Sequence, residues 1–129
     1  MANKILSRLL HDGSSGVVYF VTGFIDSDSE AVAQITDLAK LKFNPPQLRL
    51  DTILHSVEEG LLIRLWWHGV EDTLILPLGG RGVLDFDRFG GLTNPFDDGA
   101  SGNVRLSVSR TIPKTRCFSL VLEFLKQGV

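Results

Sequence analysis

A polar and an apolar side chain alternate at every position of the stretch NVRLSVS, which spans Asn103 to Ser109. Because successive side chains of a β-strand point to opposite faces, this alternation predicts a strand with one face against a core and the other in water. The residues just before it, 98–102, read Asp-Gly-Ala-Ser-Gly, which is a composition typical of a turn. The stretch therefore favours an antiparallel sheet as the basis of the fold.

The same alternation recurs on both sides of this stretch. Residues 118–124 place four apolar side chains on one face, and residues 111–115 separate them from the first run. We expect the two runs to pair as a hairpin with a loop of about five residues. Upstream, residues 61–67 and 73–78 flank a short polar link and predict a second hairpin.

Further strands are predicted where β-branched and aromatic residues lie between turn residues, at 17–25 and 48–57, with Ile5 to Leu10 as an edge strand. Many short strands separated by turns predict an all-β fold, an antiparallel β-sandwich or barrel. We expect a single β-rich domain over residues 1–129. Its N-terminal strands would lie in 1–25 and its main antiparallel sheet in 47–126.

Residues 27–43 have two interpretations. The run Ser27-Asp28-Ser29-Glu30 has the Ser-x-x-Glu form of a helix capping box, and apolar residues follow at helical spacing as far as Lys42. An extended segment is the alternative. The expected fold is therefore all-β, or mainly β with one short helix.

The composition limits the classes of function. The chain has 129 residues, of which 43% are hydrophobic and 22% charged, as in a folded single domain. Its 13 Lys and Arg residues against 15 Asp and Glu residues give a net charge of −2, which argues against a dedicated nucleic-acid binder. The N-terminus lacks the apolar run of a signal peptide, and no segment has the roughly 18 apolar residues of a membrane span. We therefore expect no nucleic-acid and no membrane partner.

The residue types that most often carry chemistry form no familiar signature. His11, His55 and His68 lie far apart, at or near predicted strand ends, and match no metal-binding or catalytic spacing. The single cysteine, Cys117, rules out an internal disulfide and fits a reducing cytoplasm. Because it borders the apolar face of its predicted strand, we interpret it as a buried small apolar side chain. No enzymatic activity, cofactor or metal is predicted.

Two loops are weaker candidates for binding. The run of residues 79–82, Gly-Gly-Arg-Gly, lacks the Lys-Ser/Thr ending of a phosphate-binding loop and is interpreted as a tight turn. Four aspartates flank one glycine-rich loop, where carboxylate oxygens suit calcium but also commonly cap turns. These aspartates are Asp85, Asp87, Asp97 and Asp98.

The pair Trp66-Trp67 places one indole on each face of a predicted strand. One indole is expected in the core. The other is expected under a second layer or in a contact surface, because tryptophan is enriched where proteins bind each other. The candidate interface residues are Trp66, His68, Arg81, Phe89 and Phe96, together with the N-terminal strand.

Several strand and turn motifs follow one another between Leu48 and Lys126. They are a strand ending in tryptophan at 60–67, an apolar strand at 72–78, an Asp-Phe segment with a glycine pair at 84–92, a Gly-Ala-x-Gly turn and strand at 99–106, and an apolar closing strand at 118–123. This order resembles small virion structural proteins of tailed bacteriophages. At residues 66–68 the chain has Trp-Trp-His, where those relatives usually have one tryptophan followed by an acidic residue.

The resemblance implies a non-enzymatic virion protein, first of all a capsid decoration or cement protein. Such a protein is made in the host cytoplasm and stabilises the shell by binding only its assembled form. Its partners would be the major capsid protein or other virion proteins, and we expect self-association as a trimer or dimer. A tail tube, neck or baseplate-associated subunit is one alternative, and a small carbohydrate- or metal-binding β module is another.

Overall fold

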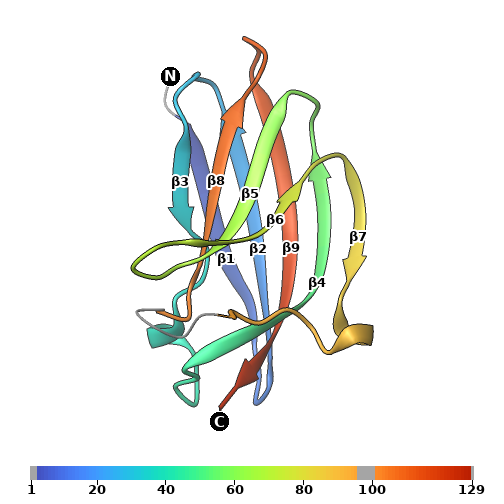
Figure 1. Cartoon of the computed structure of the whole chain (residues 1–129). Coiled ribbons are helices and arrows are strands. Elements are labelled where there is room, and N and C mark those ends of the chain that lie inside the picture. Colours follow the sequence, from blue (N-terminus) through green and yellow to red (C-terminus); the bar gives the residue numbers. More distant parts are fainter. Residues whose placement is uncertain (1–2, 96–100, 129) are drawn as a thin grey trace.

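Two antiparallel sheets face each other across the core (Figure 1). The structure is a computed structural model of the chain, and it describes residues 3–95 and 101–128. The five-stranded sheet has the order β1-β2-β9-β4-β7, and the four-stranded sheet has the order β3-β8-β5-β6. The predicted antiparallel β-sandwich is confirmed. The strands are β1 (Lys4–Asp12), β2 (Gly16–Ile25), β3 (Ala31–Gln34), β4 (Gln47–Val57), β5 (Leu61–Trp67), β6 (Thr73–Leu78), β7 (Arg81–Asp85), β8 (Val104–Arg110) and β9 (Arg116–Gln127), with 3-10 turns η1 (Leu38–Lys40) and η2 (Asp87–Phe89).

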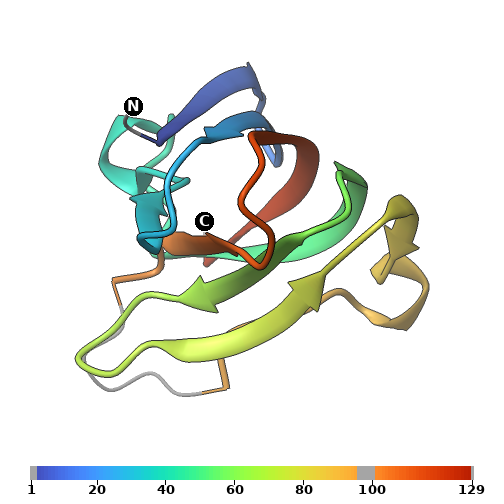
Figure 2. The ribbon, with the colours of Figure 1, turned by 90° about the horizontal axis from the view of Figure 1, so that it is seen from above.

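The core lies between the two sheets, which curve round it from either side in the view from above (Figure 2). Alternation turns every second side chain of the central strands inward, so Val21, Ile53 and Leu120 of one sheet face Leu65 and Leu106 of the other. All five side chains are completely buried. Burying one such side chain contributes roughly 2 kcal/mol, and this packing holds the two layers together.

Most predicted strands are confirmed. The hairpin of residues 61–67 with 73–78 is present as β5 and β6, and β1 is an edge strand of the five-stranded sheet. The turn from β6 to β7 contains Gly80 with φ of 65°, a left-handed conformation that glycine adopts without strain, as the tight-turn interpretation requires. Within the described residues, no helix is both long and apolar enough to cross a membrane.

The predicted hairpin of residues 103–109 with 118–124 is wrong. β8 pairs with β3 and β5, whereas β9 lies between β2 and β4 in the other sheet. The connection between them crosses from sheet to sheet, and the N–H of Thr111 donates to the carbonyl of Gly60 at 2.7 Å. The strands predicted to form one main sheet over 47–126 are also divided. β4, β7 and β9 lie in the five-stranded sheet, and β5, β6 and β8 lie in the four-stranded sheet. Alternation identifies the inward face of a strand but not its partner, which is why the pattern misled.

Residues 27–43, all described by the structure, form the edge strand β3 and the single turn η1 instead of an α-helix. The Thr36 hydroxyl accepts a hydrogen bond from the N–H of Val104 at 2.9 Å. The Asn103 side-chain oxygen accepts hydrogen bonds from the Thr36 hydroxyl at 3.1 Å and from the Leu38 N–H at 3.0 Å. These contacts with the start of β8 outweigh the local capping signal, and the extended interpretation is the correct one.

Candidate interaction surfaces on the two outer faces

Trp66 and Trp67 of β5 point to opposite sides of the four-stranded sheet. Trp67 is buried in the core, where 3% of its surface is exposed, whereas Trp66 lies half-buried on the outer face. The indole N–H of Trp66 donates to the hydroxyl of Ser107 at 2.9 Å. Ser107 also belongs to the outer face, yet only 6% of it is exposed. The indole is therefore fixed in place by a hydrogen bond while part of it stays open to a partner.

Asp72 connects the charged groups beside this indole. Its carboxylate accepts hydrogen bonds from Nδ1 of His68 at 3.1 Å and from the N–H of Gly69 at 3.3 Å, and its other oxygen lies 3.5 Å from the Arg105 guanidinium. Partial burial raises the pKa of the Asp72 carboxyl, but the hydrogen bonds and the charge of Arg105 outweigh this effect. The pKa of Asp72 is therefore lower than its ordinary value.

We call this region the Trp66 patch, defined by Trp66, His68, Asp72, Arg105 and Ser107. Beside it, Trp66, Asp72 and Ser107 line a shallow depression of about 200 Å³ together with Glu30 and Val32 of the neighbouring edge. In register, Trp66 lies opposite Arg105 on one side and Leu74 on the other. The patch presents an aromatic surface among ordered charges, which suits contact with a protein.

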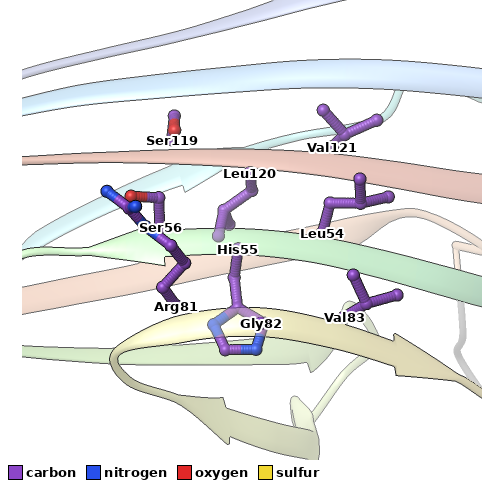
Figure 3. Close-up of a pocket in the computed structure, with 9 residues that line it drawn as sticks. All are labelled: Leu54, His55, Ser56, Arg81, Gly82, Val83, Ser119, Leu120 and Val121. Carbon is purple, nitrogen blue, oxygen red and sulfur yellow. The ribbon is translucent and has the colours of Figure 1, made fainter.

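The outer face of the five-stranded sheet has a different character. The strand registers place Phe20 of β2 beside Val121 of β9, Val121 beside Leu54 of β4, and Leu54 beside Val83 of β7. Figure 3 shows Leu54, Val83 and Val121 pointing to the same side of the sheet, while His55 and Leu120 point to the other. These four apolar side chains, from Phe20 to Val83, form a continuous line across the sheet, which we call the apolar row.

Smaller and polar side chains flank the apolar row. Ser119, Ser56 and Arg81 follow one another across the strands on one side, and Glu123, Thr52 and Asp85 do so on the other. The first set lines a shallow depression of about 290 Å³ with the apolar row as its margin (Figure 3). The Arg81 side chain lies beside Ser56 in that view, and within the described part of the chain it has no ion pair.

The structure divides the predicted interface residues among separate places. Trp66 and His68 meet in the Trp66 patch, whereas Arg81 belongs to the opposite outer face. Phe89 is 80% exposed in η2, with the Arg88 guanidinium 5.9 Å from the centre of its ring. Phe96 lies outside the described residues. The described candidates therefore lie in three places, the Trp66 patch, the opposite outer face and η2, and not on one surface.

The aspartates of the glycine-rich loop are described only in part. The Asp85 carboxylate accepts a hydrogen bond from the N–H of Asp87 at 3.1 Å, and Asp87 lies 3.3 Å from the Arg49 guanidinium. These contacts are those of turn-capping and ion-paired aspartates. Asp97 and Asp98 lie outside the described residues, and among the residues that are described no three potential metal ligands cluster together.

The interpretation of Cys117 as a buried side chain is wrong. It is exposed on the outer face of the five-stranded sheet, because its neighbour Phe118 is the one that points inward, with 4% exposure. Two of the three histidines have the hydrogen-bond partners expected near strand ends: Nδ1 of His55 lies 3.0 Å from the carbonyl oxygen of Gly80, and Nδ1 of His68 lies 3.1 Å from the Asp72 carboxylate.

Sequence reasoning missed the apolar row and the role of Asp72. Leu54 and Val121 each belong to a predicted strand, but only the register shows that they lie side by side and that Val83 of β7 lies next to Leu54. Comparisons of the chain with protein-family models, with curated proteins and with solved structures find no match. The physical properties of the two outer faces are therefore what indicates a function.

Proposed function

We propose that the chain is a non-enzymatic structural subunit of a tailed-bacteriophage virion, and specifically a decoration protein that binds the shell of major capsid proteins. The observation that carries the proposal is the half-exposed Trp66, whose indole is held by Ser107 and flanked by the Asp72 network. A fixed aromatic side chain loses little conformational freedom on binding, which is the property of residues that dominate protein interfaces. The order of strand and turn motifs over Leu48 to Lys126 resembles that of small phage virion proteins, and this resemblance is why we propose a virion as the assembly.

The Trp66 patch suits a protein partner with a complementary polar surface. Arg105 and Asp72 already neutralise each other, so the patch does not depend on a strongly charged partner. Two exposed apolar side chains lie beside the indole and extend the contact area: Val32, which lines the same depression, is 56% exposed, and Leu74, opposite Trp66 in register, is 47% exposed. A subunit bound in this way stabilises an assembled shell by mass action, since it binds the shell and not its separate parts.

The test begins with particles of the phage whose genome encodes the chain. Quantitative mass spectrometry should find the protein at a copy number comparable to that of the major capsid protein. A copy number many times lower would place it in the tail, neck or baseplate, and its absence from particles would overturn the proposal.

The second step measures particle stability. Particles that lack the protein should break at a lower temperature, and adding back the purified chain should restore their resistance. The variant Trp66→Ala should restore it poorly, whereas Lys114→Ala, exposed in the connection from β8 to β9 and outside both surfaces, should act as the wild type does. Equal rescue by both variants would show that the Trp66 patch is not the contact surface.

A further inference from the structure

We propose that a second copy of this chain packs on the outer face of the five-stranded sheet, about a two-fold axis that runs along the apolar row. The inference goes beyond the proposed function, because it concerns self-association and does not require a virion. It leaves the Trp66 patch, on the opposite side of the sandwich, free for another partner.

The first argument is the exposure of the apolar row. Leu54 is 41% exposed and Val83 is 63% exposed, although both lie within regular strands of the sheet. Single exposed apolar residues are ordinary on protein surfaces, but a contiguous line across several strands is typical of an interface. In a dimer paired along this line, the apolar row of each copy would be covered by the apolar row of the other.

The second argument is charge complementarity. Val83 is the central residue of β7, and on the same face Arg81 lies on one side of it and Asp85 on the other. A two-fold axis along the apolar row exchanges the two sides, so Arg81 of each copy comes opposite Asp85 of the other. Such reciprocal contacts define an isologous interface. The same operation brings the Ser119 side of one copy over the Glu123 side of its partner, where a hydroxyl can donate to a carboxylate.

In the rival arrangement the two-fold axis runs along β9, and Arg81 of one copy does not come opposite Asp85 of the other. It would bring Arg81 of one copy toward Leu6 on the far edge of the partner, because Arg81, Ser56, Ser119, Thr22 and Leu6 follow one another across the sheet. An arginine against an apolar side chain would then lose its water without gaining a partner. The axis along the row also brings Arg8 of β1, which lies opposite Phe20, toward Arg8 of the partner, but the two Arg81–Asp85 contacts outnumber this single like-charge contact. Charge therefore favours the axis along the row.

The third argument is area. Five strands about 4.8 Å apart, over roughly seven residues that rise about 3.3 Å each, offer a flat area of about 550 Å² per copy. Two copies would bury about 1,100 Å², and a specific interface needs about 1,000 Å² in total. The face is therefore large enough for a specific but reversible dimer.

The first experiment compares matched substitutions on the two outer faces. Sedimentation velocity should show a dimer for the wild type and for Val32→Asp, and a monomer for Val83→Asp. Val32 is 56% exposed on the edge strand β3, so it matches Val83 in residue type, exposure and edge position. Circular dichroism checks that both variants are folded. A wild-type monomer at about 100 μM, a trimer, or equal behaviour of the two variants would overturn the proposal.

The second experiment uses charge reversal. Arg81→Glu and Asp85→Arg each place like charges in both reciprocal contacts and should raise the dimer dissociation constant roughly tenfold or more. When the two variants are mixed, the carboxylate introduced in one chain faces the guanidinium introduced in the other, and the native Arg81 and Asp85 that remain also face each other. A heterodimer of near wild-type affinity should therefore form, and the double variant should likewise recover. If mixing gives no recovery, the two residues do not face each other.

The third experiment distinguishes the two axes by cross-linking. With the axis along the row, Val83 of one copy faces Val83 of the other, so Val83→Cys in a Cys117→Ser background should form a covalent dimer under mild oxidation. The native Cys117 lies four residues from Val121 on β9, so in this arrangement the two thiols of the wild type are about 26 Å apart and should not cross-link. Cross-linking of the wild type through Cys117, with none in the Val83→Cys variant, would establish the rival axis and overturn the proposal.

Discussion

The two outer faces of the sandwich hold their exposed side chains in different ways. On the four-stranded sheet, Trp66 is bonded to Ser107, and Asp72 joins His68 to Arg105. On the five-stranded sheet, Leu54 and Val83 are exposed, and Arg81 has no ion pair within the described residues. The first face is stabilised within the monomer and is preorganised for contact, whereas the second gains free energy only when another surface covers it.

The largest expected contrast is in monomer stability. Trp66→Ala should lower the free energy of unfolding by about 2 kcal/mol, because it removes a half-buried indole and leaves the buried Ser107 hydroxyl without its donor. Val83→Ala should change it by less than about 0.5 kcal/mol. Urea denaturation below the concentration at which the chain associates measures both. Equal losses would show that the two faces contribute alike to folding.

A smaller contrast is expected between two serines of the outer faces. Ser107→Ala should cost about 1 kcal/mol, since the Trp66 N–H would lose its acceptor in a partly buried position. Ser119→Ala, beside the apolar row, should stay within about 0.5 kcal/mol of the wild type. The two variants differ from the wild type by the same atom, so thermal melts compare them directly. A costly Ser119→Ala would mean that this face also carries an internal hydrogen-bond network.

The smallest expected effect is on the stability of the fold at acidic pH. The pKa of Asp72 is lower in the folded chain than in the unfolded one, so the carboxylate stabilises the fold fully above about pH 4. That contribution, less than about 1 kcal/mol for a partly exposed group, is lost as the pH falls through the lower folded value.

Asp72→Asn should therefore weaken the loss of stability as the pH falls below about 4. The comparison is made in the Val83→Asp background, which removes self-association. If Asp72→Asn melts like its background at every pH, the Asp72 network does not stabilise the fold.

The sequence predicted which residues form strands better than it predicted which strands are neighbours. The alternation in β8 correctly placed Val104, Leu106 and Val108 in the core. It could not show that β9 lies in the other sheet, because the inward faces of both strands are equally apolar. The burial of Ser107 was equally hidden, since it depends on an indole from β5 that covers it.

The candidate surfaces were predicted only in part, for the same reason. Trp66 was identified from its residue type and its position opposite Trp67, which are local features. The apolar row depends on three separate registers, of β2 with β9, of β9 with β4 and of β4 with β7. Cys117 was placed on the wrong face, although the strict alternation from Phe118 onward already assigns it to the outside.

The central position of β9 also has a consequence for how the chain folds. β2 and β4 do not pair with each other, and both lie against β9, whose residues follow their partners by 61 (Val57 and Phe118) to 109 (Gly16 and Leu125) positions in the sequence. During synthesis the five-stranded sheet therefore stays in two separate pieces until residues 116–127 have emerged from the ribosome. Contacts over such long sequence separations slow folding to milliseconds or seconds. Until then the edges of β2 and β4 stay unpaired, and the nascent chain is most exposed to aggregation during this interval.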